Sequence, residues 1–191
     1  MFLEGVLNLP NHRLFWLSLI ISLLLLAACN SQSSETESSD SFVSGSVVVD
    51  DEVVSLDDIN VVMGQTIYVP AYSEIYFEDT ERTWDFAVTL AIHNTNLDQA
   101  IIVKSVKYYD TNGQLVKDFL PEPIRLDQLV TRGYLVGRSD NRGGIGANFV
   151  VEWVADAEVT PPVVEAVLIS AAGTQGLSLI TPGRVIAEFG P

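Results

Sequence analysis

The feature that most constrains the fold is the stretch WDFAVTLAIH at residues 84–93, in which large apolar residues occupy every second position. Successive side chains of a β-strand point to opposite faces of a sheet, so this period of two predicts a strand with one buried face. The face expected to be buried carries Trp84, Phe86, Val88, Leu90 and Ile92. The opposite face carries Asp85, Thr89 and His93.

Further strand-like segments follow, separated by turns rich in glycine, proline, asparagine and aspartate. They are AIIVKSVKYY (100–109), NFVVEWV (148–154), VVEAVLIS (163–170), GLSLI (176–180) and GRVIAEF (183–189). Asn112-Gly113 predicts a tight hairpin, and the prolines of PEPIRL (121–126) suit an edge strand. Short strands at spacings of roughly 8 to 12 residues are typical of an all-β sandwich. We therefore expect a single β-sandwich domain.

The N-terminal region predicts a secretory signal. Leu14 to Ala28 is apolar apart from Ser18 and Ser22, and it is shorter than the roughly 20 residues of a membrane-spanning helix. His12 and Arg13 precede this run, as expected of a signal peptide.

The only cysteine of the chain, Cys29, ends the motif LAAC at residues 26–29. This motif resembles the lipobox of bacterial lipoproteins, which implies that Cys29 is lipidated and becomes the first residue of the mature chain. Small side chains suit entry into a peptidase cleft, and the thiol is the nucleophile that takes the diacylglycerol. Acyl chains anchor a protein firmly, because each buried CH₂ contributes about 0.8 kcal/mol. The alternative is an uncleaved anchor helix with an incidental cysteine.

The segment NSQSSETESSDS (30–41) is polar and acidic, and it predicts a flexible tether. Residues 42–63 are mixed and suit either an extra strand or an acidic linker. The expected organisation is a lipoprotein signal peptide at 1–28, a lipidated cysteine and flexible acidic tether at 29–63, and the sandwich at 64–191. Asn30 resembles an outer-membrane sorting signal, so in a host with two membranes we expect the protein on the outer membrane, facing the periplasm.

The charge of the chain argues against nucleic acid as a partner and against electrostatic attachment to anionic lipid. Ten Lys and Arg residues stand against 25 Asp and Glu, for a net charge of -15. Removing residues 1–28 takes away Glu4 and Arg13, so the charge of the mature chain is unchanged. A domain this acidic repels nucleic acid and anionic lipid surfaces. The expected partners are a membrane, through the lipid anchor, and an envelope protein or glycan.

Residues for catalysis are scarce. His93 is the only histidine after the leader, because His12 lies before the cleavage point. If Cys29 is acylated, Cys-His catalysis and a zinc site of His and Cys type are excluded. No G-x-S-x-G nucleophile motif is present. We therefore expect no enzyme, no cofactor and no metal.

The loop GRSDNRGGIGANF (137–149) is the most unusual segment. Its glycines are at 137, 143, 144 and 146, and between the first two lie Arg138, Asp140, Asn141 and Arg142. Arginines and backbone amides can bind an anionic or sugar-like group. The alternative is a long hairpin whose arginines and Asp140 tie the loop to itself.

Glu74 is a second candidate for ligand contact, because aromatic residues surround it in sequence: Tyr68, Tyr72, Tyr76, Phe77 and Trp84. Aromatic rings beside a carboxylate suit a platform for a sugar or a peptide, although strand edges and cores use the same residues. Glu74, Glu152 and Glu165 lie in strand-like segments, and a pair of carboxylates at the right separation could hydrolyse a glycoside.

Two resemblances add to these predictions. The stretch VTLAIHNTN…IIVKSVKYYDTNGQLV resembles immunoglobulin-like sandwiches of bacterial envelope proteins. The chain also resembles, within residues 64–186, a family of bacterial lipoproteins classed as a domain of unknown function. The resemblance rests on the segments IYVPAYSEIY, IHNTN, VKYYDTNGQLV, GGIGANFVVEW, PPVVEAVLIS and QGLSLITPGRVI. That family implies a fold and a compartment but no catalytic residues.

The expected function is that of a non-enzymatic, membrane-anchored envelope lipoprotein with an interaction or structural role. One alternative is a sugar- or peptide-binding protein or small hydrolase that uses carboxylates of the sandwich. Another is an assembly factor whose edge strands pair with a partner.

Overall fold

The computed structural model describes residues 51–172 and 175–190. The predicted signal peptide, Cys29 and residues 30–50 of the predicted tether lie outside the described residues. None of the helices in the described part is long and apolar enough to cross a membrane.

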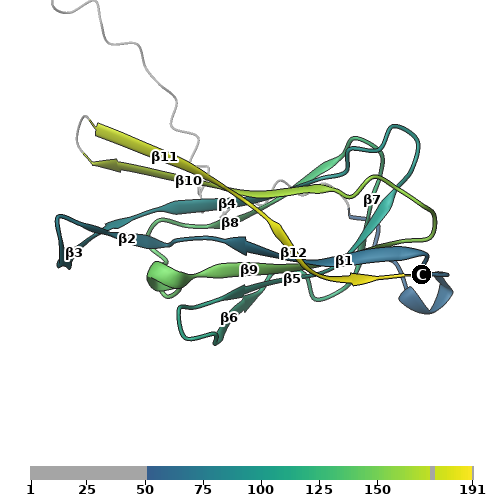
Figure 1. Cartoon of the computed structure of the whole chain (residues 1–191), viewed down its shortest axis with the longest axis horizontal. Coiled ribbons are helices and arrows are strands. Elements are labelled where there is room, and N and C mark those ends of the chain that lie inside the picture. Colours follow the sequence, from purple (N-terminus) through teal and green to yellow (C-terminus); the bar gives the residue numbers. More distant parts are fainter. Residues whose placement is uncertain (1–50, 173–174, 191) are drawn as a thin grey trace, which may run out of the picture. The chain divides into compact units, whose positions relative to one another are not determined.

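The described chain forms two antiparallel sheets and a separate hairpin (Figure 1). One sheet has the strand order β12-β1-β9-β5-β6, with β7 also paired to β5, and the other has the order β11-β10-β4-β8. The first contains β1 (Met63–Pro70), β5 (Ile101–Tyr109), β6 (Leu115–Asp118), β7 (Ile124–Leu126), β9 (Asn148–Ala155) and β12 (Arg184–Phe189). The second contains β4 (Ala87–His93), β8 (Thr131–Val136), β10 (Val163–Ala172) and β11 (Gln175–Pro182). The hairpin is β2 (Glu74–Phe77) and β3 (Asp79–Asp85), and the 3₁₀ turns are η1 (Leu56–Asp58) and η2 (Gly144–Gly146).

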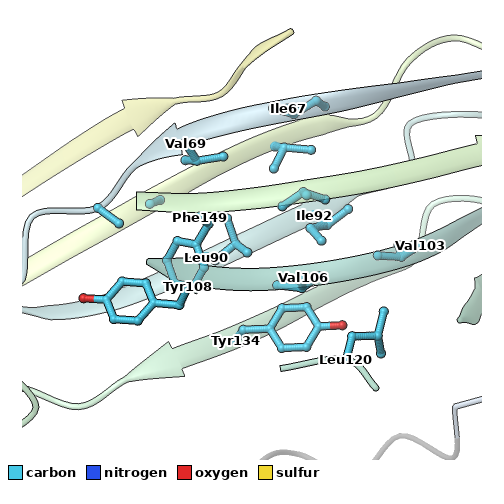
Figure 2. Close-up of a cluster of buried hydrophobic side chains, with 14 of the residues drawn as sticks. Ile67, Val69, Leu90, Ile92, Val103, Val106, Tyr108, Leu120, Tyr134 and Phe149 are labelled. Carbon is cyan, nitrogen blue, oxygen red and sulfur yellow. The ribbon is translucent and has the colours of Figure 1, made fainter. Parts of the chain in front are cut away.

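The core lies between the two sheets, where apolar side chains from both sheets meet (Figure 2). Val69 and Phe149 come from one sheet and Leu90 and Ile92 from the other, and all four are fully buried. Burial of this kind is the main favourable contribution to folding. The predicted all-β sandwich is confirmed, whereas its immunoglobulin-like character stays a prediction.

The alternating stretch at residues 84–93 is divided between two strands rather than forming one. Val88, Leu90 and Ile92 of β4 are buried as predicted, but Trp84 belongs to β3. The break falls at Phe86, whose backbone N–H donates to the Ser73 carbonyl at 2.8 Å. This contact is made outside the strand ladders, so β3 can pair with β2 while β4 pairs with β8 and β10.

The hairpin predicted at Asn112-Gly113 is confirmed, and it joins β5 to β6. Gly113 has a φ of +77°, which glycine adopts without the steric cost that other residues meet. The Asp110 side chain accepts bonds from the N–H groups of Asn112 and Gln114, at 2.8 and 2.7 Å. Sequence and turn geometry therefore agree here.

The chain changes sheets between β11 and β12, in the yellow part of Figure 1. Gly183 is the linking residue, and its N–H donates to the Val164 carbonyl at 2.8 Å. A Cβ at this position would lie 2.6 Å from Ile67 Cγ2, closer than such atoms approach. Glycine at residue 183 thus allows the backbone to pass close to the core.

Residues before Met63 also contact the sandwich. The Val54 N–H donates to the Pro123 carbonyl at 3.0 Å, and the Arg125 N–H donates to the Glu52 carbonyl at 2.9 Å. The Asp51 carboxylate forms an ion pair with Arg132 of β8. Contacts with the sheets therefore begin upstream of residue 64, where the sequence places the start of the domain.

Candidate functional site

The loop that joins β8 to β9 carries four of the five predicted ligand-contacting residues. Within it, Arg142 Nε and Nη2 donate to the two carboxylate oxygens of Asp140, each at 2.7 Å. The hydrogen bonds from Arg142 lower the pKa of Asp140, and the same contact raises the pKa of Arg142. Such paired bonds to a carboxylate fix the geometry of the loop.

Arg138 and Asn141 are also held by protein groups. Arg138 Nη1 donates to the Ala171 carbonyl at 2.6 Å, near the end of β10. The Asn141 carbonyl accepts from the Gly144 N–H at 3.1 Å. Both arginines of the loop therefore bind other parts of this chain, and a ligand role for them stays a prediction.

Glu74 lies beside the glycines of the same loop. Ser73, the residue before it, donates to the Gly144 carbonyl from both its N–H and its hydroxyl, each at 3.2 Å. A Cβ at Gly144 would lie 3.9 Å from Glu74 Oε1. The structure thus brings Glu74 to the loop that carries the other four candidates, although the two segments are far apart in sequence.

The other carboxylates considered for hydrolysis lie far from one another in the fold. Glu152 of β9 alternates with buried residues, so it lies on the outer face of its sheet, where it pairs with Lys104 Nζ at 2.8 Å. Glu165 of β10 lies on the outer face of the other sheet by the same alternation. The two outer faces are on opposite sides of the sandwich, so these carboxylates do not converge.

Beneath the loop lies a group that sequence reasoning missed, the hydroxyl of Tyr108. Tyr108 is 1% exposed, and its hydroxyl has no hydrogen-bond partner in the described part of the chain. Burial raises the pKa of Tyr108, against a smaller lowering by the nearby Ser73 side chain. The ring packs on Phe149 (Figure 2), and the two ring centroids are 4.9 Å apart. A Cβ at Gly143 would lie 2.0 Å from the hydroxyl, so the loop glycine leaves room for it.

His93 lies at the end of β4, as expected of a strand-end residue. Its Nδ1 is 2.8 Å from Thr131 Oγ1 of the neighbouring strand. Within residues 51–172 and 175–190, no three His, Cys, Asp or Glu side chains are grouped as metal ligands would be.

A second feature is an apolar groove between the β2–β3 hairpin and the start of β11, which we call the hairpin groove. Its volume is about 400 Å³. Its lining consists of Ile75, Phe77, Trp84, Gln175, Gly176 and Leu177. The rings of Phe77 and Trp84 stack with centroids 5.0 Å apart, and Phe77 is 41% exposed.

The sequence indicated candidate residues on only one side of this groove, the side formed by the β2–β3 hairpin. Phe77 and Trp84 were among the aromatics predicted around Glu74, whereas Gly176 and Leu177 entered only as part of a strand. No local signal could join the two segments, because their contact depends on how the sheets pack. Both hairpins, β2–β3 and β10–β11, extend toward the same end of Figure 1.

Comparisons with known proteins identify a family but no activity. The family described as "Protein of unknown function (DUF3124)" matches residues 64–186. No curated protein matches the chain significantly. A crystal structure of Thermotoga maritima 1070 aligns with 66% of this chain and 96% of its own, at 10% identity and a TM-score of 0.39. That likeness is too low to carry an argument about fold or function.

Proposed function

Because the chain belongs to the DUF3124 family, whose activity is unknown, its function has to be argued from its own residues, and we propose that it is a lipid-anchored envelope protein with a non-enzymatic interaction role. The observation that carries the proposal is the segment from Leu14 to Ser41. It joins an apolar run, the LAAC motif and a polar acidic segment in the order that a lipoprotein precursor needs. In a host with two membranes, Asn30 favours the outer membrane, with the domain in the periplasm.

The charge of the mature chain supports a covalent anchor over electrostatic attachment. At -15, the chain is repelled by anionic lipid surfaces. Acyl chains on Cys29 overcome this repulsion, because three chains bury many CH₂ groups at about 0.8 kcal/mol each. Residues 30–50, if they act as a flexible linker, would give the domain a typical reach of about 25 Å.

The described domain supports an interaction role through its surface. Apolar surface remains accessible in the hairpin groove, where Phe77 is 41% exposed. In the β8–β9 loop, Arg142 binds Asp140 and Arg138 binds the Ala171 carbonyl of β10, as an interaction module with a fixed surface would require.

Metabolic labelling with palmitate tests the anchor. The wild-type chain should take up label and stay with membranes after alkaline extraction, and the Cys29→Ser variant should lose both properties. Ser33→Ala, in the segment after the cysteine, is the matched control and should behave as wild type. A wild-type chain without label would end the proposal.

A further inference from the structure

We infer that the hairpin groove binds an extended, basic segment of a partner protein, which pairs with the free edge of β11 and inserts an apolar side chain between β11 and the β2–β3 hairpin. The inference deepens the proposed function, because it names the chemistry of the partner. Three observations carry it: the lining of the groove, the strand beside it and the charge around it.

The lining of the groove suits an apolar side chain better than a sugar. Among the six described residues that line it, Gln175 alone has a polar side chain. A sugar site needs several polar groups that converge on the hydroxyls of the ligand, whereas an apolar anchor needs surface from which it can exclude water. Ile75, Trp84 and Leu177 are already half-buried against the core. An inserted side chain would therefore complete their burial.

The strand beside the groove offers backbone groups for pairing. β11 is the last strand of its sheet, so on one side it pairs with β10 and on the other with no strand among residues 51–172 and 175–190. Gln175, Gly176 and Leu177 of the groove belong to this strand. An extended segment added to such an edge gains main-chain hydrogen bonds, and side chains at alternate positions can enter an adjoining pocket.

The charge around the groove selects a basic partner. The β2–β3 hairpin holds five carboxylates and one arginine within residues 74–85. The arginine, Arg82, is already paired with Glu78 and with Asp79. By strand alternation Glu81 and Asp85 point away from the face of Trp84, so their carboxylates act on the groove across the hairpin and are partly screened, since the screening length is about 8 Å at physiological salt. Arg138 is a cation near the groove, because it donates to the carbonyl of Ala171, the cross-strand partner of Gly176. The five carboxylates of the hairpin and the net charge of -15 outweigh it, so the net charge around the groove is negative.

A second copy of this chain is a less suitable occupant. Each copy carries a net charge of -15, so two acidic hairpins would meet without opposing charge. A partner segment with lysine or arginine on one face and leucine or an aromatic residue on the other satisfies both the charge and the apolar lining.

The test measures binding of fluorescent peptides to the full chain in detergent. The first probe is a nine-residue peptide with lysine at alternate positions and leucine at its centre. The second replaces lysine with glutamate, the third replaces the central leucine with glycine, and the fourth is the first with alternate backbone amides N-methylated. We expect the first to bind and the other three to bind about tenfold more weakly or worse, which corresponds to about 1.4 kcal/mol.

Variants of the protein locate the binding. Phe77→Ala removes an exposed groove side chain and should weaken the first probe about fivefold or more, as expected of an apolar anchor contact. Leu135→Ala is the matched control, because Leu135 is a 55% exposed strand residue at the opposite edge of the β11 sheet. Its binding should stay within about twofold of wild type, since truncation outside the contact costs little. Both positions are exposed, so both variants should fold.

Several results would overturn the inference. They are no binding of the first probe, equal binding of the lysine and glutamate probes, unchanged binding by the N-methylated probe, or equal effects of Phe77→Ala and Leu135→Ala. A dimer in sedimentation that Phe77→Ala dissociates would assign the groove to a second copy instead. The assay is repeated with Cys29→Ser, which should bind as wild type. Loss of the anchor and loss of peptide binding are therefore separate outcomes.

Discussion

Replacing Gly143 with alanine should destabilise the sandwich strongly, because the new methyl group has no space. Its Cβ would lie 2.0 Å from the Tyr108 hydroxyl and 2.6 Å from Ala147 Cβ, where ordinary contacts are 3.4 Å or more. Tyr108 and Ala147 are each 1% exposed, so neither can move into solvent. The backbone is not the obstacle, since φ of Gly143 is −69°.

The expected cost lies near the upper end of the range for overpacking, at about 3 kcal/mol. A domain of this size loses about 2–4 °C in Tm for each kcal/mol, so the melting temperature should fall by about 6–12 °C. Urea unfolding followed by circular dichroism measures the free energy of unfolding, and a thermal melt followed by the same signal measures Tm. Gly137→Ala is the control, because no heavy atom lies within 4 Å of its Cβ, and its stability should stay within about 0.5 kcal/mol of wild type.

A second substitution, at Tyr108, tests whether the contact with the Tyr108 hydroxyl causes the loss of stability. Tyr108→Phe removes the oxygen that lies nearest to the new methyl group, and with it a buried hydroxyl that has no hydrogen-bond partner among the described residues. The double variant Tyr108→Phe with Gly143→Ala should recover about 1 kcal/mol or more beyond the sum of the single effects, as expected for residues in contact. If Gly143→Ala costs no more than Gly137→Ala, or if Tyr108→Phe recovers nothing, the close contact beneath the loop is wrong.

Two further predictions concern buried polar groups. Burial raises the pKa of Tyr134 to about 12, above its value in an unfolded chain of about 10. The contribution of neutral Tyr134 to the free energy of unfolding should therefore be fully present below about pH 10 and be lost as the pH rises toward 12. Between pH 8 and pH 11, urea unfolding should show a smaller fall in this free energy for Tyr134→Phe than for the wild type. An equal fall would contradict this prediction. The buried Asn94 donates from Nδ2 to the carbonyls of Gln99, Leu126 and Asp127, so Asn94→Ala should cost about 3 kcal/mol. Thr95→Ala, at an exposed neighbour, should cost little in the same unfolding experiment, and similar losses for both would refute the role of Asn94.

Local pattern predicted β4, β5, β9, β10, β11 and β12, whereas the segments that form β1 and β8 were not predicted as strands. The buried positions of β4 followed from alternation, and the β5–β6 turn followed from Asn112-Gly113. The break at Phe86 could not be predicted, because it depends on a hydrogen bond to Ser73 on a separate segment. The alternation continues through the break, so the sequence alone shows one strand where the structure has two.

The candidate site was predicted only in part, because local composition marks a loop but does not show which distant segments pack against it. The unusual composition of residues 137–149 marked the loop, and the structure adds that Glu74 lies beside Gly144. No feature of the sequence indicated that the Tyr108 hydroxyl is buried beside the loop, since tyrosine is common in strands. The hairpin groove needs residues from β2, β3 and β11, and only the packing of the sheets brings these together.

The central claim is that the thiol of Cys29 carries lipid, and the intact mass of the mature protein from its native host tests it most directly. We predict a chain that begins at residue 29 and is heavier than its amino acids by a diacylglycerol group with or without a further acyl chain. A mature chain that begins at another residue, or one that begins at residue 29 with an unmodified thiol, would contradict it.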